Sequence, residues 1–326
     1  MIAGTVVALC GGIGGAKLAL GLYRVLPPDT LTVVVNTGDD FEHLGLSISP
    51  DVDTVLYTLA GLDNPQTGWG RRDETWTFMQ VLESLGGESW FRLGDGDLAL
   101  HVERTRRLTA GETLTRIIAD VTARWGVAAR VLPMGDQPVR TLIESDGTTL
   151  GFQEYFVARK CSPKITSVSF QGLEHAHATE DVLADISASD TRAIVICPSN
   201  PYLSIDPLMA LPDLRSAVAN SDAPVVAVSP IIGGEAVKGP AAKIMMELGL
   251  PVSPVTVARH YTGLINGYIL DEADSALQSA IDVPALAVQT LMTTLEDKQA
   301  LAESVLAFAE GLARVSHHDD EPSLDL

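Results

Sequence analysis

The stretch Thr5-Val6-Val7-Ala8-Leu9-Cys10-Gly11-Gly12-Ile13-Gly14-Gly15-Ala16-Lys17 decides the fold of this 326-residue chain. It begins as an apolar, β-branched run typical of a buried strand and breaks into four glycines before the amphipathic run from Leu18 to Leu26. A strand that turns through glycines into a helix leaves backbone N–H groups and the positive end of the helix dipole facing outward. We therefore expect an anion site here, most often one for phosphate.

Neither of the two familiar phosphate-binding fingerprints fits this loop. Read from Gly12, the dinucleotide motif G-x-G-x-x-G/A places its last position on Lys17, and the second strand ends on Asn36 rather than on a ribose-binding acid. A Walker motif needs Ser or Thr after the lysine, and Leu18 stands there. An alternative in which the glycines serve only close packing stays open. We favour phosphate binding. The predicted residues are Gly12, Gly14, Gly15 and Lys17.

The composition argues against several classes of partner. Because 42 acidic residues outnumber 22 basic ones, the net charge is −20, which disfavours nucleic acids and anionic membranes. Three well-separated cysteines without a C-x-x-C pair disfavour a disulfide framework or a structural zinc site. No basic leader and no apolar run of membrane-spanning length are present in the sequence. We expect a soluble, cytoplasmic protein with small-molecule ligands.

Four aspartates lie within fifteen residues of one another, after the second predicted strand, Leu31 to Val35. The carboxyl ends of strands in an open α/β sheet face the ligand crevice, so these acids should lie beside the glycine loop. Turn formation and helix capping account for some of them. Magnesium, which binds a few carboxylates together with substrate phosphate, accounts for all four. We expect Mg²⁺ at Asp39, Asp40 and Asp51, with Asn36 and Thr37 near the phosphates.

Two further polar loops follow strands in the second half of the chain, where strands and helices alternate as in a parallel sheet. Their Ser, Asn, Gly and Pro residues are also ordinary turn formers. The second loop combines glycines, a lysine and a helix start, as the first loop of the chain does. Two such loops at one sheet edge suit a ligand with two phosphates. The predicted residues are Ser199, Asn200, Gly233, Gly234 and Lys238.

The middle of the chain differs in composition. Trp69, Trp76 and Trp90 alternate with glycines and arginines, which favours an aromatic wall for a planar ligand over a regular core. His101 and Arg104 lie one helical turn apart, and an alternative in which they are simply solvated stays open.

The predicted fold is therefore α/β, a Rossmann-like parallel sheet flanked by helices, with an inserted α+β lobe. Residues 1–60 and 164–315 form the core, residues 61–163 form the lobe that contains the aromatic wall, and residues 316–326 form a disordered acidic tail.

Seven motifs, in order, resemble the 2-phospho-L-lactate transferase family of deazaflavin coenzyme F420 biosynthesis. The resemblance runs from the first strand to about Leu312. The motifs are residues 11–17, Val35-Asn36-Thr37-Gly38-Asp39-Asp40, residues 48–57, Arg92-Leu93-Gly94-Asp95, Leu132-Pro133-Met134, Pro198-Ser199-Asn200-Pro201 and residues 228–233.

The resemblance implies a Mg²⁺-dependent transfer of a phospho-acid from a guanosine diphospho donor to the ribityl hydroxyl of the deazaflavin Fo, with release of GMP. It places Asp53 and Arg92 on the positions that contact Fo. Asp51 and Asp53 are then the catalytic candidates, Asp53 by orienting or deprotonating the hydroxyl. The donor's acid, whether lactate, enolpyruvate or glycerate, stays open, since the sequence departs from the family pattern at Ile13 and Gly96.

Two other interpretations compete with this one. A nucleotide-binding regulatory protein of the same fold would bind without turnover, whereas the four acids favour an enzyme. An NAD-dependent oxidoreductase is disfavoured by the failed dinucleotide fingerprint. The oligomeric state stays open, although large α/β enzymes are often homodimers.

Overall fold

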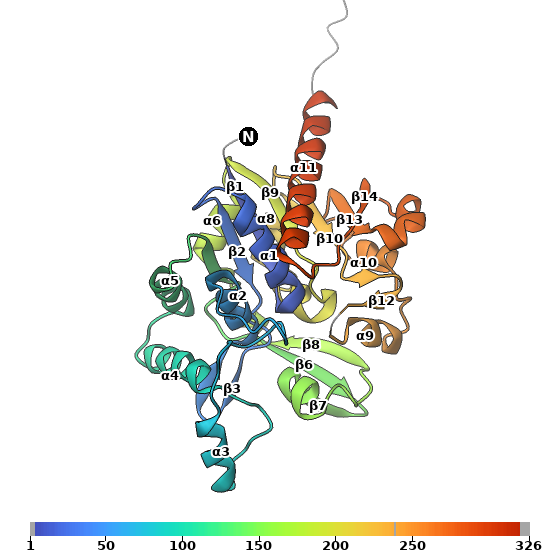
Figure 1. Cartoon of the computed structure of the whole chain (residues 1–326). Helices are drawn as coiled ribbons and strands as arrows, with labels where there is room; N and C mark the ends of the chain where they lie inside the picture. The colour runs from blue at the N-terminus through green and yellow to red at the C-terminus, as the bar shows by residue number, and fades with distance from the viewer. Residues whose placement is uncertain (1–3, 238, 320–326) are drawn as a thin grey trace, which may run out of the picture.

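The computed structural model of the chain describes residues 4–237 and 239–319, and at its centre lies a seven-stranded parallel sheet (Figure 1). The strand order is β14-β13-β10-β9-β1-β2-β5, which confirms the predicted Rossmann-like α/β fold. The strands are β1 (Thr5–Cys10), β2 (Leu31–Val35), β5 (Arg130–Pro133), β9 (Thr191–Ile196), β10 (Val225–Val228), β13 (Gly267–Asp271) and β14 (Ala285–Val288).

Strand β1 is an inner strand of this sheet, fifth in the strand order, and both of its faces are covered. Val7 and Leu9 belong to one buried cluster, whereas Val6, Ala8 and Cys10 belong to the other. The strand pairs in parallel with β2 on one side and with β9 on the other. The strand order therefore reverses between β1 and β9: β2 and β5 follow on one side of this point, and β10, β13 and β14 follow on the other. Open α/β sheets bind ligands at such a point, outside the carboxyl ends of the strands.

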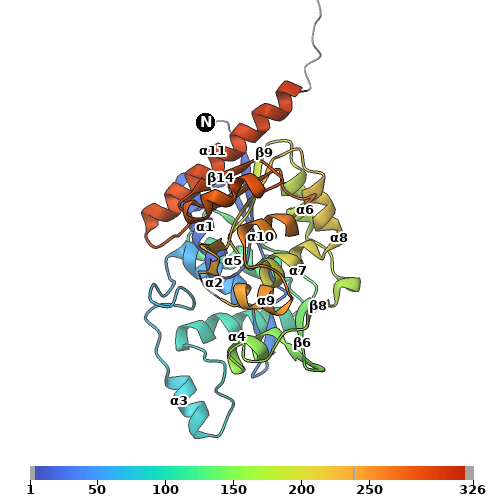
Figure 2. The same ribbon diagram turned by 90° about the vertical axis from the view of Figure 1, so that its right-hand side faces the viewer.

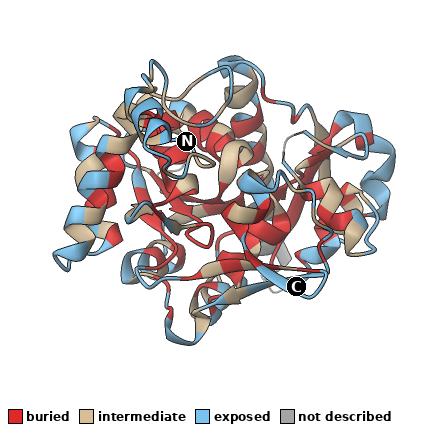
Figure 3. Ribbon diagram, turned by 90° about the horizontal axis from the view of Figure 1, so that it is seen from below, coloured by how far each residue is buried: buried red, intermediate tan, exposed pale blue. Residues whose placement is uncertain are grey.

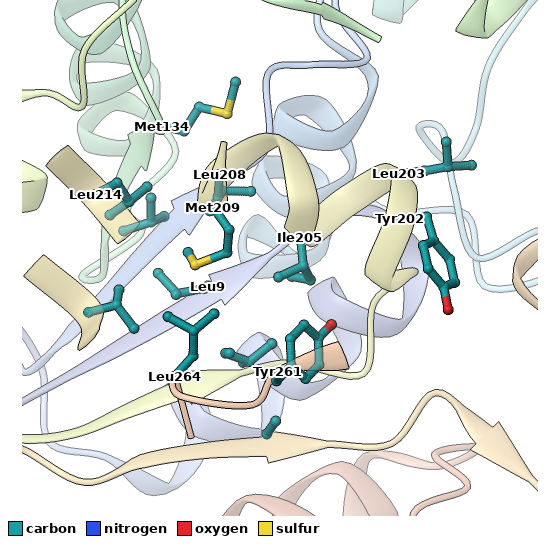
Figure 4. Packing of buried hydrophobic residues seen from close by; sticks show 14 of the residues in the cluster. Leu9, Met134, Tyr202, Leu203, Ile205, Leu208, Met209, Leu214, Tyr261 and Leu264 are labelled. Carbon is teal, nitrogen blue, oxygen red and sulfur yellow. The ribbon is translucent and has the colours of Figure 1, made fainter. Parts of the chain in front are cut away.

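Helices cover both faces of the sheet (Figures 1 and 2). Figure 4 shows Leu9 of β1 packed near Met209 and Leu264 on one face, and Figure 3 shows buried residues concentrated along the central strands. The face with Val7 and Leu9 carries α6 (Glu180–Ser187), α7 (Asp206–Met209), α8 (Pro212–Ala219), α9 (Ala241–Glu247) and α10 (Pro254–His260). The opposite face, with Val6, Ala8 and Cys10, carries α1 (Gly12–Val25), α2 (Pro50–Ala60), α5 (Leu114–Arg124) and α11 (Leu295–Asp319).

Two excursions lie beyond the carboxyl edge of the sheet (Figure 1). The first has a small core of Ile48, Met79 and Leu93 and contains the hairpin β3 (Phe41–His43) and β4 (Leu46–Ile48) with α3 (Thr77–Ser84) and α4 (Asp95–Thr109). The second is the antiparallel sheet β7-β6-β8. Its elements are β6 (Arg140–Ser145), β7 (Thr148–Gly151), β8 (Ser167–Gln171) and the π-helix η1 (Glu154–Ala158).

Several short elements complete the chain. They are the hairpin β11 (Ile231–Ile232) and β12 (Glu235–Ala236), the π-helix η3 (Pro201–Ile205) and the 3₁₀ segments η2 (Leu173–His175) and η4 (Glu272–Ala280). No helix in the described part of the chain combines the length and the apolar character that crossing a bilayer requires.

The structure divides the middle of the chain differently from the predicted lobe at residues 61–163. Strand β5 lies inside that range but pairs with β2 in the main sheet. The apolar runs at residues 152–158 and 165–170 also predict strands, the second of them in the parallel sheet. The second run instead leads into β8 of the antiparallel sheet, and the first is helical, with the π-helix η1 over Glu154–Ala158. Apolar runs predict a strand but not its partner, because pairing depends on residues far away in the chain. Helix α11 continues to Asp319, past the predicted start of the tail at 316, and residues 320–326 lie outside the described range.

The contact between α1 and α11 depends on a glycine. A Cβ built on Gly21 would collide with the carbonyl oxygen of Lys298 in α11. We therefore expect Gly21→Ala to lower the free energy of unfolding by about 1–3 kcal/mol, since the backbone of α11 must shift. Urea titration measures this difference.

Gly311→Ala is the matched control on α11, because a Cβ there meets nothing within 4 Å. It should raise the free energy of unfolding by up to about 1 kcal/mol through helix propensity. Equal effects of the two substitutions would contradict the proposed close contact.

Candidate functional site

The glycine loop is held tightly at the point where β1 and β9 separate. The N–H of Gly11 donates to Oγ of Ser199, 3.2 Å away, so the loops after β1 and β9 touch. A Cβ on Gly14 would collide with the carbonyl of Pro198, and one on Gly15 would meet both Cys10 and Ser199 at 2.6 Å. Close packing, the alternative left open by the sequence, therefore explains these glycines.

A cavity of about 630 Å³ opens beside this loop, between the sheet edge and the two excursions. This volume is typical of sites for small molecules and cofactors. The predicted site residues that line it are Gly12, Gly14, Lys17, Asp39, Asp51, Asp53, Arg92, Ser199 and Asn200.

The other predicted residues lie behind or away from the cavity lining. Asn36 is fully buried and donates from Nδ2 to Oδ2 of Asp51 at 3.0 Å, so it orients that acid. Gly233 and Gly234 are in the exposed turn of the β11–β12 hairpin, where the N–H of Gly233 donates to Asp274. The remaining residues that the lining leaves out are Gly15, Thr37 and Asp40, and Lys238 lies outside the described residues.

Asp39, Asp40 and Asp51 are called the acid cluster here; Asp39 and Asp51 are buried and Asp40 is half-buried. Burial and the charge of Asp51 raise the pKa of Asp39 well above its usual value. Burial raises the pKa of Asp40 to about 7, against a hydrogen bond from Ser49 and the charges of Arg140 and Arg104. Burial raises the pKa of Asp51 to about 6, against hydrogen bonds from Asn36 and the backbone. Oδ1 of Asp39 and Oδ1 of Asp40 find no hydrogen-bond partner among the described residues, so the acid cluster has unused acceptor capacity.

Asp51 also occupies a backbone donor of the first loop that would otherwise be open to an anion. Its carboxylate accepts a hydrogen bond from the backbone of Gly12, at the start of α1. The N–H groups of Gly11 and Gly12 are thus engaged by Ser199 and Asp51. Lys17 donates from Nζ to the carbonyl of Met292 at 2.7 Å while also lining the cavity.

Asp53 is paired with a residue that the motifs did not identify. Arg104 of α4, only 1% exposed, binds both carboxylate oxygens of Asp53 through Nη1 and Nη2. Burial of His101 at 2% exposure likewise excludes the solvated alternative for these two residues. The signal was present in the sequence: Asp97, His101 and Arg104 follow the i, i+4, i+7 spacing of one helix face.

One trio of potential metal ligands gathers in the described part of the chain, and it differs from the acid cluster. Single ligand atoms of Asp53, Asp97 and His101 lie within 4.8 Å of one another. Arg104 already supplies positive charge to this trio through its ion pair with Asp53. The ligand atoms of the acid cluster do not converge within that distance, but its unpartnered carboxylate oxygens and raised pKa values fit the chemistry of a hard divalent cation.

The predicted aromatic wall is divided between two roles. Trp69, which is 55% exposed, and Trp90 line the cavity. Trp76 lies instead beneath Arg92, whose guanidinium carbon is 4.3 Å from the ring centroid. Trp90 packs edge-on against Phe91 and His43. The wall thus presents two tryptophans and a stacked arginine to a ligand.

A Rossmann-like sheet with a large, acid-lined cavity at its strand-order reversal defines an α/β protein with a ligand-sized site where this class of sheet binds its ligands. The family model for 2-phospho-L-lactate transferase CofD matches residues 6–307. The chain belongs to this family and is a transferase.

Named relatives carry two different activities. A phosphoenolpyruvate transferase of Streptomyces griseus is 40% identical over 314 residues, which cover 94% of this chain and 98% of the relative. A 2-phospho-L-lactate transferase of Methanosarcina acetivorans is 37% identical over 303 residues, covering 92% and 97%. A crystal structure of a UPF0052 family protein from Bacillus halodurans has a TM-score of 0.62 at 17% identity, covering 94% of this chain and 99% of that chain, and this supports the fold.

Removing Arg104 would leave Asp53 buried without its counter-charge. We expect Arg104→Met to lower the free energy of unfolding by about 3–5 kcal/mol, the usual cost of breaking a buried pair from one side. Urea titration checks this value.

Arg106→Met on the same helix is the control. Its pair with Glu103 is exposed, and such pairs contribute at most about 1 kcal/mol. A loss for Arg104→Met as small as that of the control would show that the buried pair does not hold α2 against α4.

The acid cluster also predicts a pH dependence. The folded-state pKa of Asp40, about 7, exceeds the unfolded value near 4, so the folded chain holds this proton more tightly and loses stability as pH rises between the two values. Asp40→Asn cannot ionise. In metal-free buffer, its unfolding free energy relative to the wild type should therefore be higher at pH 8 than at pH 5, as measured by urea titration.

Asp73→Asn is the control for this experiment, because the Asp73 side chain is 92% exposed. Its effect should be the same at both pH values. An Asp40→Asn effect that does not change with pH would contradict the raised pKa.

Proposed function

We propose that the chain transfers a phospho-acid from a guanosine diphospho donor to the ribityl hydroxyl of Fo in coenzyme F420 biosynthesis, releasing GMP. The observation that carries this proposal is the charge of the cavity. Four carboxylates line it, from Asp39, Asp51, Asp53 and Asp97, and the described residues supply only Lys17 and Arg92 as lining Lys or Arg side chains. A diphosphate donor needs further positive charge to enter such a site.

The acid cluster is our proposed magnesium site. Asp39, Asp40 and Asp51 would hold Mg²⁺, and their raised pKa values would fall as the cation replaces the missing counter-charge. The bound ion would neutralise the donor's phosphates and the charge that develops during transfer. Asn36 would keep Asp51 pointing at this site.

The two substrates would occupy opposite halves of the cavity. The diphosphate would lie between the first loop and the turn at Ser199 and Asn200, since these residues line the cavity at the sheet edge. The planar deazaflavin would lie against Trp69 and Trp90, which line the side formed by the first excursion.

Asp53 would orient the acceptor hydroxyl instead of removing its proton. Both of its oxygens bind the guanidinium of Arg104, and a carboxylate held in this way still has lone pairs that can accept a hydrogen bond from the hydroxyl. In phosphoryl transfer, positioning contributes more than covalent chemistry by the protein, so this role is sufficient. Asp51 would then act through the magnesium site.

The donor's acid is the part of the proposal that the relatives leave divided, since their names specify both phosphoenolpyruvate and phospholactate. Gly96 is one of the two departures from the family pattern. It lies against the guanidinium of Arg71, which fills the space that a side chain at position 96 would need. A cation is therefore present at this place from a different part of the chain.

The deciding experiment incubates the purified protein with Fo, MgCl₂ and guanylylated lactate, enolpyruvate or glycerate in separate reactions. We expect the mass of the Fo adduct and stoichiometric GMP with one of these donors, and loss of both products when EDTA replaces MgCl₂.

No adduct with any donor would overturn the transferase assignment to Fo. Binding of a guanylylated donor without turnover in every reaction would support the alternative of a nucleotide-binding regulatory protein. Product formation that continues in EDTA would contradict the proposed magnesium site while leaving the reaction intact.

A further inference from the structure

We propose that His101 is a positioning residue for the transfer: it closes a ring of side chains between α2 and α4 that fixes Asp53 in the cavity wall. This inference rests on the proposed function, because the reaction gives Asp53 its purpose. Nothing in the motifs or in the names of the relatives assigns a role to His101.

The ring is built from two helices. On α4, the 3.6-residue repeat places Asp97, His101 and Arg104 on one face. On α2, Asp53 and Tyr57 lie one turn apart. Arg104 binds Asp53, and Tyr57 donates from its hydroxyl to Oδ1 of Asp97 at 2.7 Å.

His101 is the link that joins these two pairs. Its Nδ1 lies 3.4 Å from Nη1 of Arg104, and its Nε2 lies 3.1 Å from Oδ2 of Asp97, a close polar contact outside hydrogen-bond geometry. With these contacts the ring runs from Asp53 through Arg104, His101, Asp97 and Tyr57 back to the same helix. The helices therefore hold each other at two places, which are one turn apart on α2 and about two turns apart on α4.

The donors and acceptors of the ring fix the form of the imidazole. A guanidinium can only donate hydrogen bonds, so Nδ1 of His101 must accept from Arg104. The proton of a neutral imidazole then sits on Nε2, facing the carboxylate of Asp97. With both nitrogens directed at protein groups, His101 is placed to hold its neighbours and not to exchange protons with a substrate.

The groups that face His101 come from both helices. They are Asp53 and Tyr57 from α2 and Asp97 and Arg104 from α4. Oδ2 of Asp53 lies 3.7 Å from Nδ1, so the imidazole borders the ion pair that it is proposed to hold in place.

The ring leaves Asp53 a narrow range of positions. Arg104 has one further contact, from Nη1 to the carbonyl of Ser47 at 3.3 Å, and its Nε finds no hydrogen-bond partner among the described residues. Without His101, the guanidinium would keep Asp53 but could rotate with it. The expected result is a displaced carboxylate in a folded protein, not an unfolded one.

Two substitutions separate positioning from simple packing. His101→Gln keeps a donor for Asp97 and an acceptor for Arg104. His101→Leu keeps bulk but removes both. We expect kcat of the Leu variant to fall by about 100-fold, the cost of a small misplacement at a reacting centre, while the Gln variant stays within about tenfold of the wild type.

The binding of Fo gives a readout that does not need turnover. Titration of the intrinsic fluorescence of each variant with Fo alone should show a Kd raised by about tenfold in His101→Leu, the usual cost of weakening a hydrogen bond to a charged group. The KM for the guanylylated donor should change by less than about twofold, because the loops proposed to hold the donor, at Gly12 and at Ser199, carry no member of the ring.

Thr32→Val is the control, since Thr32 of β2 is buried at 1% exposure and donates to Oδ2 of Asp185, and neither residue lines the cavity. It should lower the melting temperature without changing Kd for Fo or kcat. Wild-type affinity and kcat in His101→Leu, or equal losses in the Leu and Gln variants, would overturn the positioning role alone. A wild-type protein that fails to bind Fo would overturn the proposed function and this role together.

Discussion

Close contact between the loops after β1 and β9 is the constraint on which the rest of the structure depends. The N–H of Gly11 reaches Ser199, and backbone from the β9 loop occupies the space where a side chain at Gly14 would project. This contact closes the floor of the cavity and directs α1 and α2 so that Asp51 meets the start of α1. The glycines serve packing first, and the ligand site forms around that packing.

The same contact limits what the loop offers to an anion. Since Ser199 and Asp51 already engage the first N–H groups of the loop, the backbone offers an incoming phosphate less than a free helix end would. Oδ1 of Asp39 and Oδ1 of Asp40 have no hydrogen-bond partner among the described residues. In the proposed function, a cation that enters with the ligand would serve both the carboxylates and the phosphates, so binding of the ion and binding of the phosphates would be one event.

Local pattern was enough to predict the strand-glycine-helix start, the parallel sheet and the position of the acids, because each depends on residues close in sequence. Strand β2 was predicted with the bounds that the structure shows. The assignment of β5 to the main sheet and of β8 to the antiparallel sheet depends on distant partners, which periodicity does not encode. The role of Arg104 was missed for a related reason. Arg104 on α4 pairs with Asp53 on α2, which lies fifty-one residues earlier in the chain, so the pair exists only because the fold brings the two helices together.

Helix α2 begins with Pro50, and its first turn carries both Asp51 and Asp53. One acid belongs to the cluster proposed to hold the cation, and the other is the residue proposed to orient the acceptor. Because the two positions are two residues apart, they are separated by about 3 Å along the helix axis and by about 200° around it. The proposed cation and the proposed acceptor would therefore lie on different sides of one rigid helix, whose first turn would set their spacing.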